Sequence, residues 1–213
     1  MSKKETSLYF LNNFLPEGAF DLVAPYFQNH TIHLTLTHER KSVLGDYRTP
    51  TKDQPYHRIS INVNLNKYSF LITLVHELAH LLTFVNFRNA TPHGKEWKTQ
   101  FRHMLIPFLG KSFFPKDVEA ALIEYVKNPA ASTCTDPGLF KALYRYDERK
   151  PGYKLVDDLE IGHWFETEDG RVFEKLDELR TRSRCLDIAT GKRYYFQGIV
   201  EVKHIRRDKR KIA

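Results

Sequence analysis

The sequence predicts an α+β protein, in which a helix-rich part at residues 1–150 is followed by a small β-rich segment at residues 151–213. Two patterns support this class. In the first part most apolar residues recur at helical spacing, and short alternating runs interrupt them. After Pro151 and Gly152, apolar and polar residues alternate in short runs that turn signals separate. We therefore expect helices with a short antiparallel sheet, followed by a small antiparallel β-rich segment.

The helix-rich part contains three alternating runs, each of which is expected to be a strand. Residues 31–37 read TIHLTLT, in which every second residue is apolar, as in a half-buried strand. A turn at 38–41 returns the chain through 42–48, and a proline-containing loop leads to a further strand at 58–63.

Most of the remaining residues of this part are expected to be helical. The first 30 residues have helical spacing, broken at Pro16 and again at Pro25. Further helices are expected after the strands, at 68–87, 94–109, 114–126 and 139–146. The β-rich segment is expected to form strands at 162–167, 171–175, 179–186, 192–196 and 199–205.

The cysteine content and the hydropathy pattern favour a cytoplasmic protein. Cys134 and Cys185 lie far apart and form no CxxC pair, which fits a reduced compartment and excludes a zinc ribbon built of cysteines. We expect no signal peptide and no membrane partner, because no uncharged apolar run reaches the ~20 residues that a membrane span needs.

The net charge of +7 is concentrated in residues 178–213, which hold 11 of the 33 Lys and Arg but 4 of the 26 Asp and Glu. Arg180, Arg182 and Arg184 alternate, so on a strand their side chains would share one face at a spacing of about 7 Å. Basic residues beside the aromatic run at 194–196 suit a phosphate backbone with stackable bases. We therefore expect DNA or RNA binding through residues 178–213. A solvated sheet face with a basic tail is the alternative.

The helix expected at 68–87 carries the motif HELAH. With about 100° of rotation per residue, His80 lies about 40° and Glu77 about 100° from His76, while the large apolar residues cover the opposite side. Histidines at i and i+4 can both place a ring nitrogen about 2.0–2.1 Å from one zinc ion. The motif therefore predicts a metal site, and a structural histidine pair is the alternative.

A catalytic zinc site needs a third protein ligand and keeps one position open. The residues after His80 lack the glycine and histidine of the metzincin arrangement, so that class is excluded. His93 is the preferred third ligand, because the intervening residues let the helix end and the chain turn back, and because a proline and a glycine flank it. Glu96 and His103 are the alternatives.

Glu77 would be held beside the metal without coordinating it. There it can act as a general base toward a zinc-activated water, the role of the glutamate in HExxH metalloproteases. Other polar residues are weaker candidates. Asn62 and Asn64 could orient the ligands, although capping or turn roles are equally compatible. Tyr47 and His57 could donate a hydrogen bond to an oxyanion, but no spacing distinguishes either one.

The pairing of HELAH with HGKEW resembles the SprT family of zinc metallopeptidases, whose human relative is Spartan. The resemblance extends from about Ile32 to Leu109, and it includes HLTLTHERKSVLGDYR, RISINVNLN and Trp97 at the aromatic position after HG. It implies a zincin-like α+β domain with one catalytic zinc ion. The implied ligands are His76, His80 and His93, and the implied catalytic glutamate is Glu77.

The resemblance also bears on partners. Members related to Spartan cleave proteins attached to DNA. Many members carry a four-cysteine zinc ribbon after the protease domain, but the corresponding region of this chain holds only Cys185. We therefore expect residues 151–213 to be metal-free.

Taken together, the residues and the resemblance predict a zinc metalloendopeptidase that acts on protein substrates, among them DNA-associated proteins. A non-proteolytic nucleic-acid-associated protein with a structural zinc is the alternative. A metal-dependent hydrolase of small amides is a third possibility.

Overall fold

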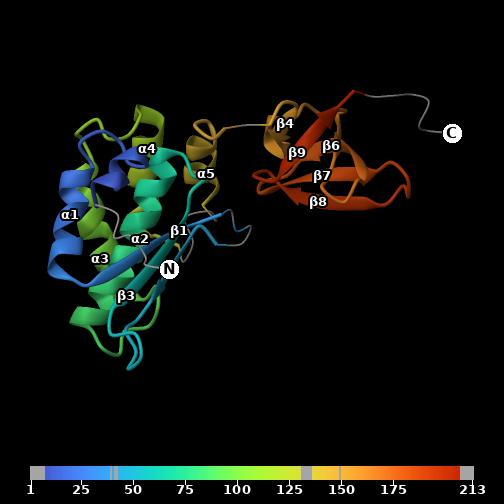
Figure 1. Cartoon of the computed structure of the whole chain (residues 1–213). Coiled ribbons are helices and arrows are strands. Elements are labelled where there is room, and N and C mark those ends of the chain that lie inside the picture. The colour runs from blue at the N-terminus through green and yellow to red at the C-terminus, as the bar shows by residue number, and fades with distance from the viewer. Residues whose placement is uncertain (1–7, 39, 41–42, 131–135, 149, 207–213) are drawn as a thin grey trace. The chain divides into compact units, whose positions relative to one another are not determined.

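The computed structural model describes residues 8–38, 40, 43–130, 136–148 and 150–206. The chain divides into two compact units, Met1–Asp147 and Glu148–Ala213 (Figure 1). Helices and a sheet form the first unit, and a second sheet dominates the other, so the α+β class is confirmed. The assignment of residues 1–150 and 151–213 as separate functional domains stays a prediction.

Two helical segments begin the first unit, the 3-10 helix η1 (Leu8–Asn13) and helix α1 (Phe20–Asn29). The expected break at Pro25 is wrong, because α1 continues through this residue. Pro25 and Asp21 are both exposed, so water can bond to the Asp21 carbonyl that Pro25 leaves without an N–H donor.

The sheet of the first unit contains β1 (Ile32–Thr37), β2 (Gly45–Arg48) and β3 (His57–Asn62), in the order β1-β3-β2. The expectation of an antiparallel sheet here is wrong, because β3 pairs with β1 in parallel and with β2 antiparallel. An alternating pattern determines which face of a strand is buried, but not the direction of its neighbour. The central place goes to β3, whose Ile59 and Ile61 are fully buried, and β2 is left at the edge.

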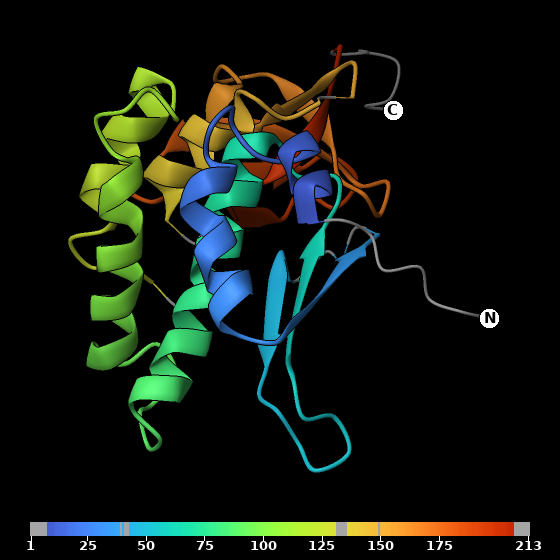
Figure 2. The same ribbon diagram turned by 60° about the vertical axis from the view of Figure 1, so that its left-hand side comes forward.

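Helix α2 (Lys67–Asn86) runs through the middle of the first unit, between the sheet and helix α3 (Lys95–Leu105) (Figure 2). Asn66 caps α2, since its side chain accepts hydrogen bonds from the backbone N–H groups of Tyr68 and Ser69. By length and composition alone α2 could cross a membrane, but 72% of its apolar window is buried in the protein. Such burial is that of a core helix on which the other layers pack.

The expected helix at 94–109 is shorter than predicted and ends in a 3-10 turn. Pro107 lies in this turn, where a proline cannot donate the backbone bond that would continue an α-helix. The elements after α3 are the 3-10 helix η2 (Ile106–Phe108), α4 (Lys116–Tyr125) and α5 (Pro137–Tyr144). Trp97 and Phe101 of α3 and Leu122 of α4 complete the core around α2.

The second unit is a sheet with the strand order β4-β9-β5-β6-β7-β8, and its paired strands are antiparallel as expected. Its elements are β4 (Tyr153–Leu155), the 3-10 helix η4 (Val156–Asp158), β5 (Trp164–Glu166), β6 (Val172–Glu178), β7 (Arg182–Asp187), β8 (Arg193–Gln197) and β9 (Glu201–Ile205). The strand β4 was not predicted, because three residues are too few to show an alternation.

The second unit buries a lysine beside its apolar core. The Lys175 ammonium is inaccessible to solvent and donates hydrogen bonds to the carbonyls of Val156 (3.0 Å) and Leu159 (2.7 Å) and to the Glu178 carboxylate (2.5 Å). These partners replace the water that a buried charge loses. Lys175 therefore ties β6 to the segment around η4.

The prediction that three alternating arginines share one strand face is wrong for Arg180. Arg182 and Arg184 belong to β7, but Arg180 precedes this strand in a turn that the Leu179 N–H closes on the Arg182 carbonyl (2.7 Å). Because β6 ends at Glu178, the chain must reverse within a few residues, and Arg180 lies in that reversal.

Candidate metal centre

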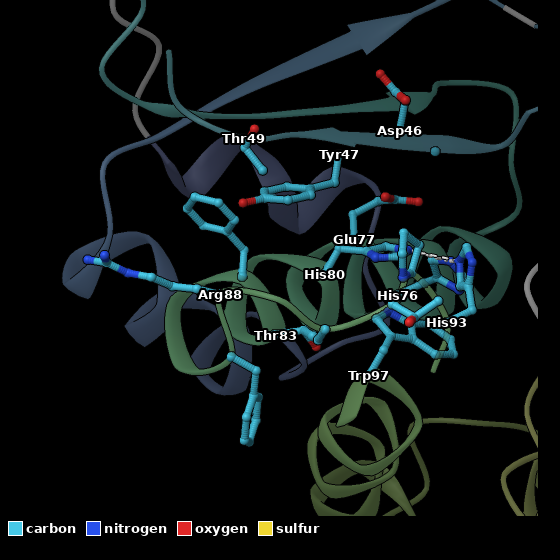
Figure 3. Close-up of a pocket in the computed structure, with 16 residues that line it drawn as sticks. Asp46, Tyr47, Thr49, His76, Glu77, His80, Thr83, Arg88, His93 and Trp97 are labelled. Atoms are coloured by element: carbon cyan, nitrogen blue, oxygen red, sulfur yellow. Dashed lines mark hydrogen bonds between the residues drawn. The ribbon is translucent and has the colours of Figure 1, made fainter. Parts of the chain in front are cut away.

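Three histidines of the first unit direct their Nε2 atoms toward one another (Figure 3). His76 and His80 come from consecutive turns of α2, and His93 comes from the loop between α2 and α3. The Nε2 atoms lie 3.3 Å apart for His76–His80, 3.2 Å for His76–His93 and 2.9 Å for His80–His93. The structure thus brings together all three predicted ligands, and the group could hold a metal ion.

This triangle of nitrogen atoms has nearly the size that a tetrahedral zinc ion requires. Zn–N bonds of about 2.0–2.1 Å at tetrahedral angles separate two ligand nitrogens by about 3.3–3.4 Å. Hydrogen bonding alone cannot explain three mutual contacts. Each Nε2 of a neutral imidazole is either a donor or an acceptor, so at least one of the three contacts must join two atoms of the same kind. A shared cation satisfies all three nitrogens.

Burial keeps the three imidazoles in the neutral form that binds metals. Burial, together with the neighbouring His80 and His93, lowers the pKa of His76 to about 3. Burial and His93 lower the pKa of His80 to about 4, against an opposing effect of Asp46. Burial also lowers the pKa of His93. Protons therefore compete weakly with a cation near neutral pH.

The third histidine reaches the site from a strained turn. His93 has a backbone φ of 58°, in the left-handed region, which costs a residue other than glycine on the order of 1 kcal/mol. The Thr91 carbonyl accepts a bond from the Gly94 N–H (2.9 Å), and a Cβ on Gly94 would lie 2.9 Å from the same oxygen. Glycine after His93 therefore permits a turn tight enough to direct the imidazole back toward α2.

Trp97 fixes the three imidazoles from the core side. Its indole is fully buried, and the ring centroid lies 4.6, 5.3 and 4.8 Å from those of His76, His80 and His93, respectively. The indole also stacks on Phe101 at 5.0 Å. Packing of this kind restricts the rotamers of the histidines, so each imidazole is held in one orientation.

Glu77 lies beside the triangle and is 5% exposed. Burial, together with Asp46 and against an opposing effect of Arg40, raises its pKa to about 8. The backbone of β2 comes so close to this side chain that a Cβ on Gly45 would lie 2.6 Å from Glu77 Oε1. The sequence did not point to Gly45, because such a close approach depends on tertiary packing.

The other candidate residues lie elsewhere. Glu96 and His103 do not join the histidine group, and His103 is exposed. Asn62 donates hydrogen bonds to the carbonyls of Arg40 (3.2 Å) and Val43 (3.0 Å), so it holds the connection between β1 and β2 rather than a ligand. Asn64 is exposed in the turn before α2.

Tyr47 forms a wall of the site. Its ring is parallel to that of His80 at 6.2 Å, and its hydroxyl forms a hydrogen bond with Nδ1 of His57 at 2.9 Å. Figure 3 shows this hydroxyl pointing away from the three histidines. Tyr47 therefore presents its ring to His80, and its hydroxyl is engaged by His57.

The histidines and Glu77 lie at one end of a cleft of about 450 Å³. The edge strand β2 lines one side through Gly45, Asp46 and Tyr47. The far end is lined by Phe84 and Arg88, among others, which no motif in the sequence had marked. The described residues line this cleft without enclosing it, so the histidines and Glu77 can be reached from solvent.

Comparison with known proteins identifies the part of the chain that holds this site. Residues 18–108 match the model of the SprT-like family. This segment is similar to the SprT-like family. It contains the three histidines and Glu77, together with every element from α1 to η2.

One curated relative adds to the family match. Protein SprT of Yersinia enterocolitica is 46% identical to this chain over 41 residues, which are 19% of this chain and 24% of that protein. The chain thus spans about a quarter of the length of the relative it matches. No solved structure matches the chain.

Proposed function

We propose that the first unit is a zincin-like metallopeptidase domain and that the protein is a zinc-dependent endopeptidase of SprT type. The observation that carries this proposal is the convergence of three neutral imidazoles beside a buried carboxyl in an open cleft. Three nitrogen ligands with one open position are typical of catalytic zinc sites. The SprT-like match over residues 18–108 supports the same reading.

The chain's own residues have separate roles in this proposal. His76, His80 and His93 would hold the zinc ion. A bound zinc ion supplies Lewis-acid polarisation of the scissile carbonyl and lowers the pKa of water to about 7. In its carboxylate form, the buried Glu77 side chain can accept a proton from the attacking water and return it to the leaving amine. Trp97 holds the imidazoles, and Gly45 limits the position of the Glu77 carboxyl.

The edge strand β2 can bind the substrate backbone. It pairs with β3 on one side, and its other side borders the cleft. An extended peptide could add to this edge through main-chain hydrogen bonds, as in other β-augmentation complexes. A protein or peptide substrate fits this geometry better than a small amide, because a small amide would leave the strand edge without a partner.

Replacement of Glu77 by Gln tests the proposal. The variant should retain one equivalent of zinc, because Glu77 is not in the histidine group, and it should lose cleavage of an unfolded protein substrate. Glu96→Gln is the matched control, since Glu96 is a nearby acid outside the group. Full cleavage by the Glu77 variant, or the absence of bound zinc in the native protein, would overturn the proposal.

We also propose that nucleic acid binds the outward face of β7 and β8. Arg182 and Arg193 are exposed there, and Tyr195 is 55% exposed directly opposite Arg184. Arg184 forms an ion pair with Asp177, whereas Arg182 and Arg193 form no ion pair with any residue that the structure describes. Exposed arginines around an exposed tyrosine suit a phosphate backbone and a stacked base. The basic residues of 207–213 lie outside the described residues.

This surface also supports the alternative function, a non-proteolytic nucleic-acid-associated protein in which zinc braces the fold. Replacing Arg182 and Arg193 by Gln should weaken binding of single-stranded DNA and reduce its salt dependence by about two phosphate contacts. Lys203→Gln is the control, because Lys203 is on β9 and pairs with Glu166. If nucleic-acid binding persists while no substrate is ever cleaved, the alternative is the better account.

We propose a cytoplasmic location, because Cys185 is a buried free thiol of the kind that a reduced compartment preserves. Cys134 lies outside the described residues.

A further inference from the structure

Beyond the histidines, the cleft continues to an end formed by two phenylalanines. Phe84 and Phe87 line this end and are 39% and 42% exposed, respectively. Exposed aromatic side chains on a concave surface are typical of ligand-binding sites. The two rings therefore face a space that is continuous with the metal position.

The sheet side of this aromatic end is held in place. The hydroxyl of Tyr47 bonds to His57, and the Phe84 ring packs edge-on against the same imidazole at 6.0 Å. Phe84 is thus supported by the protein on one side while it still lines the cleft. An apolar group that enters here would displace water from Phe84, Phe87 and the ring of Tyr47 without reordering the site.

Helix α2 sets the distance between the aromatic end and the metal position. Phe84 follows His80 by one turn, which corresponds to about 6 Å along the helix axis. An extended peptide advances about 3.3 Å per residue. A side chain that reaches Phe84 therefore belongs to a residue about two positions from the one whose carbonyl lies at the histidines.

Charge at this end disfavours basic side chains. Arg88 lines the same part of the cleft and is exposed, and none of the carboxylates in the described ranges pairs with it. A lysine or arginine of the substrate would be repelled there, whereas a neutral apolar side chain would not.

We propose that Phe84 and Phe87 form a subsite for a large apolar side chain of the substrate, about two residues from the scissile bond. This inference rests on the proposed peptidase function and defines its substrate class. Phe, Leu, Ile and Met are mostly buried in folded proteins. The substrate is therefore an extended, unfolded polypeptide segment that exposes such a residue, and not a loop of polar composition.

Peptide binding tests this subsite independently of cleavage. The full-length, zinc-loaded Glu77→Gln protein is titrated with fluorescein-labelled alanine-rich peptides, in which one Phe is moved along the sequence, and anisotropy is measured. The tightest Phe peptide should bind about tenfold more tightly than its all-alanine counterpart. Adding Phe84→Ala should bring this ratio close to one. Val85→Ala should leave it unchanged, because Val85 is 45% exposed on the same helix but does not line the cleft.

Each result separates the subsite from the peptidase activity. Equal binding of Phe and alanine peptides, or equal loss in the Phe84 and Val85 variants, overturns the subsite. Selective binding that depends on Phe84, together with no cleavage by the zinc-loaded native protein, supports the subsite and overturns the peptidase proposal. Cleavage by the native protein without preference for Phe supports the peptidase and overturns the subsite.

Discussion

Gly45→Ala is the sharpest perturbation that the structure offers, because it changes one methyl group beside Glu77. The added Cβ would lie 2.6 Å from Glu77 Oε1 and 2.6 Å from Cγ2 of Thr73, whereas ordinary contacts begin at 3.4 Å. The carboxyl must therefore withdraw by roughly 0.8 Å, and misplacement near 1 Å costs on the order of 10²-fold in rate. We expect kcat/KM to fall about 10- to 100-fold.

The assay compares cleavage of an unfolded protein by the native protein and the variant, together with the zinc content of each. Zinc content should stay at one equivalent, because the three heavy atoms nearest to the new methyl group belong to Glu77 and Thr73 and not to the histidines. The effect should therefore appear in the chemical step and not in metal loading.

A second variant distinguishes displacement of Glu77 from general overpacking. Adding Thr73→Ser to Gly45→Ala removes the methyl group that Gly45 would meet and keeps a hydroxyl, which in Thr73 bonds to the Ser69 carbonyl at 2.7 Å. Activity should remain low in the double variant, since the contact with Glu77 persists. Undiminished activity in Gly45→Ala, or its full recovery in the double variant, would refute the reasoning.

Three further predictions concern pH and stability. Glu77 carries a pKa near 8 in the metal-free fold against 4.5 for the free residue, so it destabilises that fold as pH rises from 4.5 to 8. In the metal-free protein, Glu77→Gln should therefore raise the free energy of unfolding at pH 8 by on the order of 1–3 kcal/mol and leave it unchanged at pH 4.5. Equal free energies of unfolding for the two proteins at both pH values would contradict this. Because the pKa values of His76 and His80 are about 3 and 4, zinc should stay bound on acidification to about pH 5.5, as measured with a chelating dye. Release of half the zinc near pH 6.5 would instead show that these histidines have ordinary pKa values. Lys175→Met should lower the free energy of unfolding of the full-length protein by about 2–4 kcal/mol, as measured in urea, because two carbonyls and Glu178 lose their buried donor. An unchanged midpoint of urea unfolding would show that water replaces the ammonium.

The sequence predicted the histidine group well, because helix geometry alone places His76 and His80 on one face. The choice of His93 depended on a chain length that allows a return and on a flanking glycine, and the structure has both the turn and a positive φ at that residue. Trp97 was marked by its motif, but its contact with all three imidazoles could be seen only in the fold.

Long-range pairing was less predictable than local structure. The alternation in β1 and β3 identified strands, yet the parallel pairing of the two needed a choice of neighbour that alternation does not encode. Pro25 indicated a break, but an exposed proline near the start of a helix costs little when water can bond to the free carbonyl. Gly45 and Phe84 were missed for a related reason, because their importance comes from residues that are distant in the chain.

The left-handed turn at His93 links metal binding to the shape of the cleft. Two of the nitrogen donors are carried by a rigid helix, whereas the third is carried by the connection that also supplies Phe87, Arg88 and Pro92 to the groove wall. A cation bound by both would hold the connection against helix α2. The backbone strain at His93 favours movement of the connection away from the helix once the cation is removed. Chelation should then expose the Arg88 peptide bond to trypsin, so that loss of the metal would also alter the end of the cleft that Phe87 and Arg88 line.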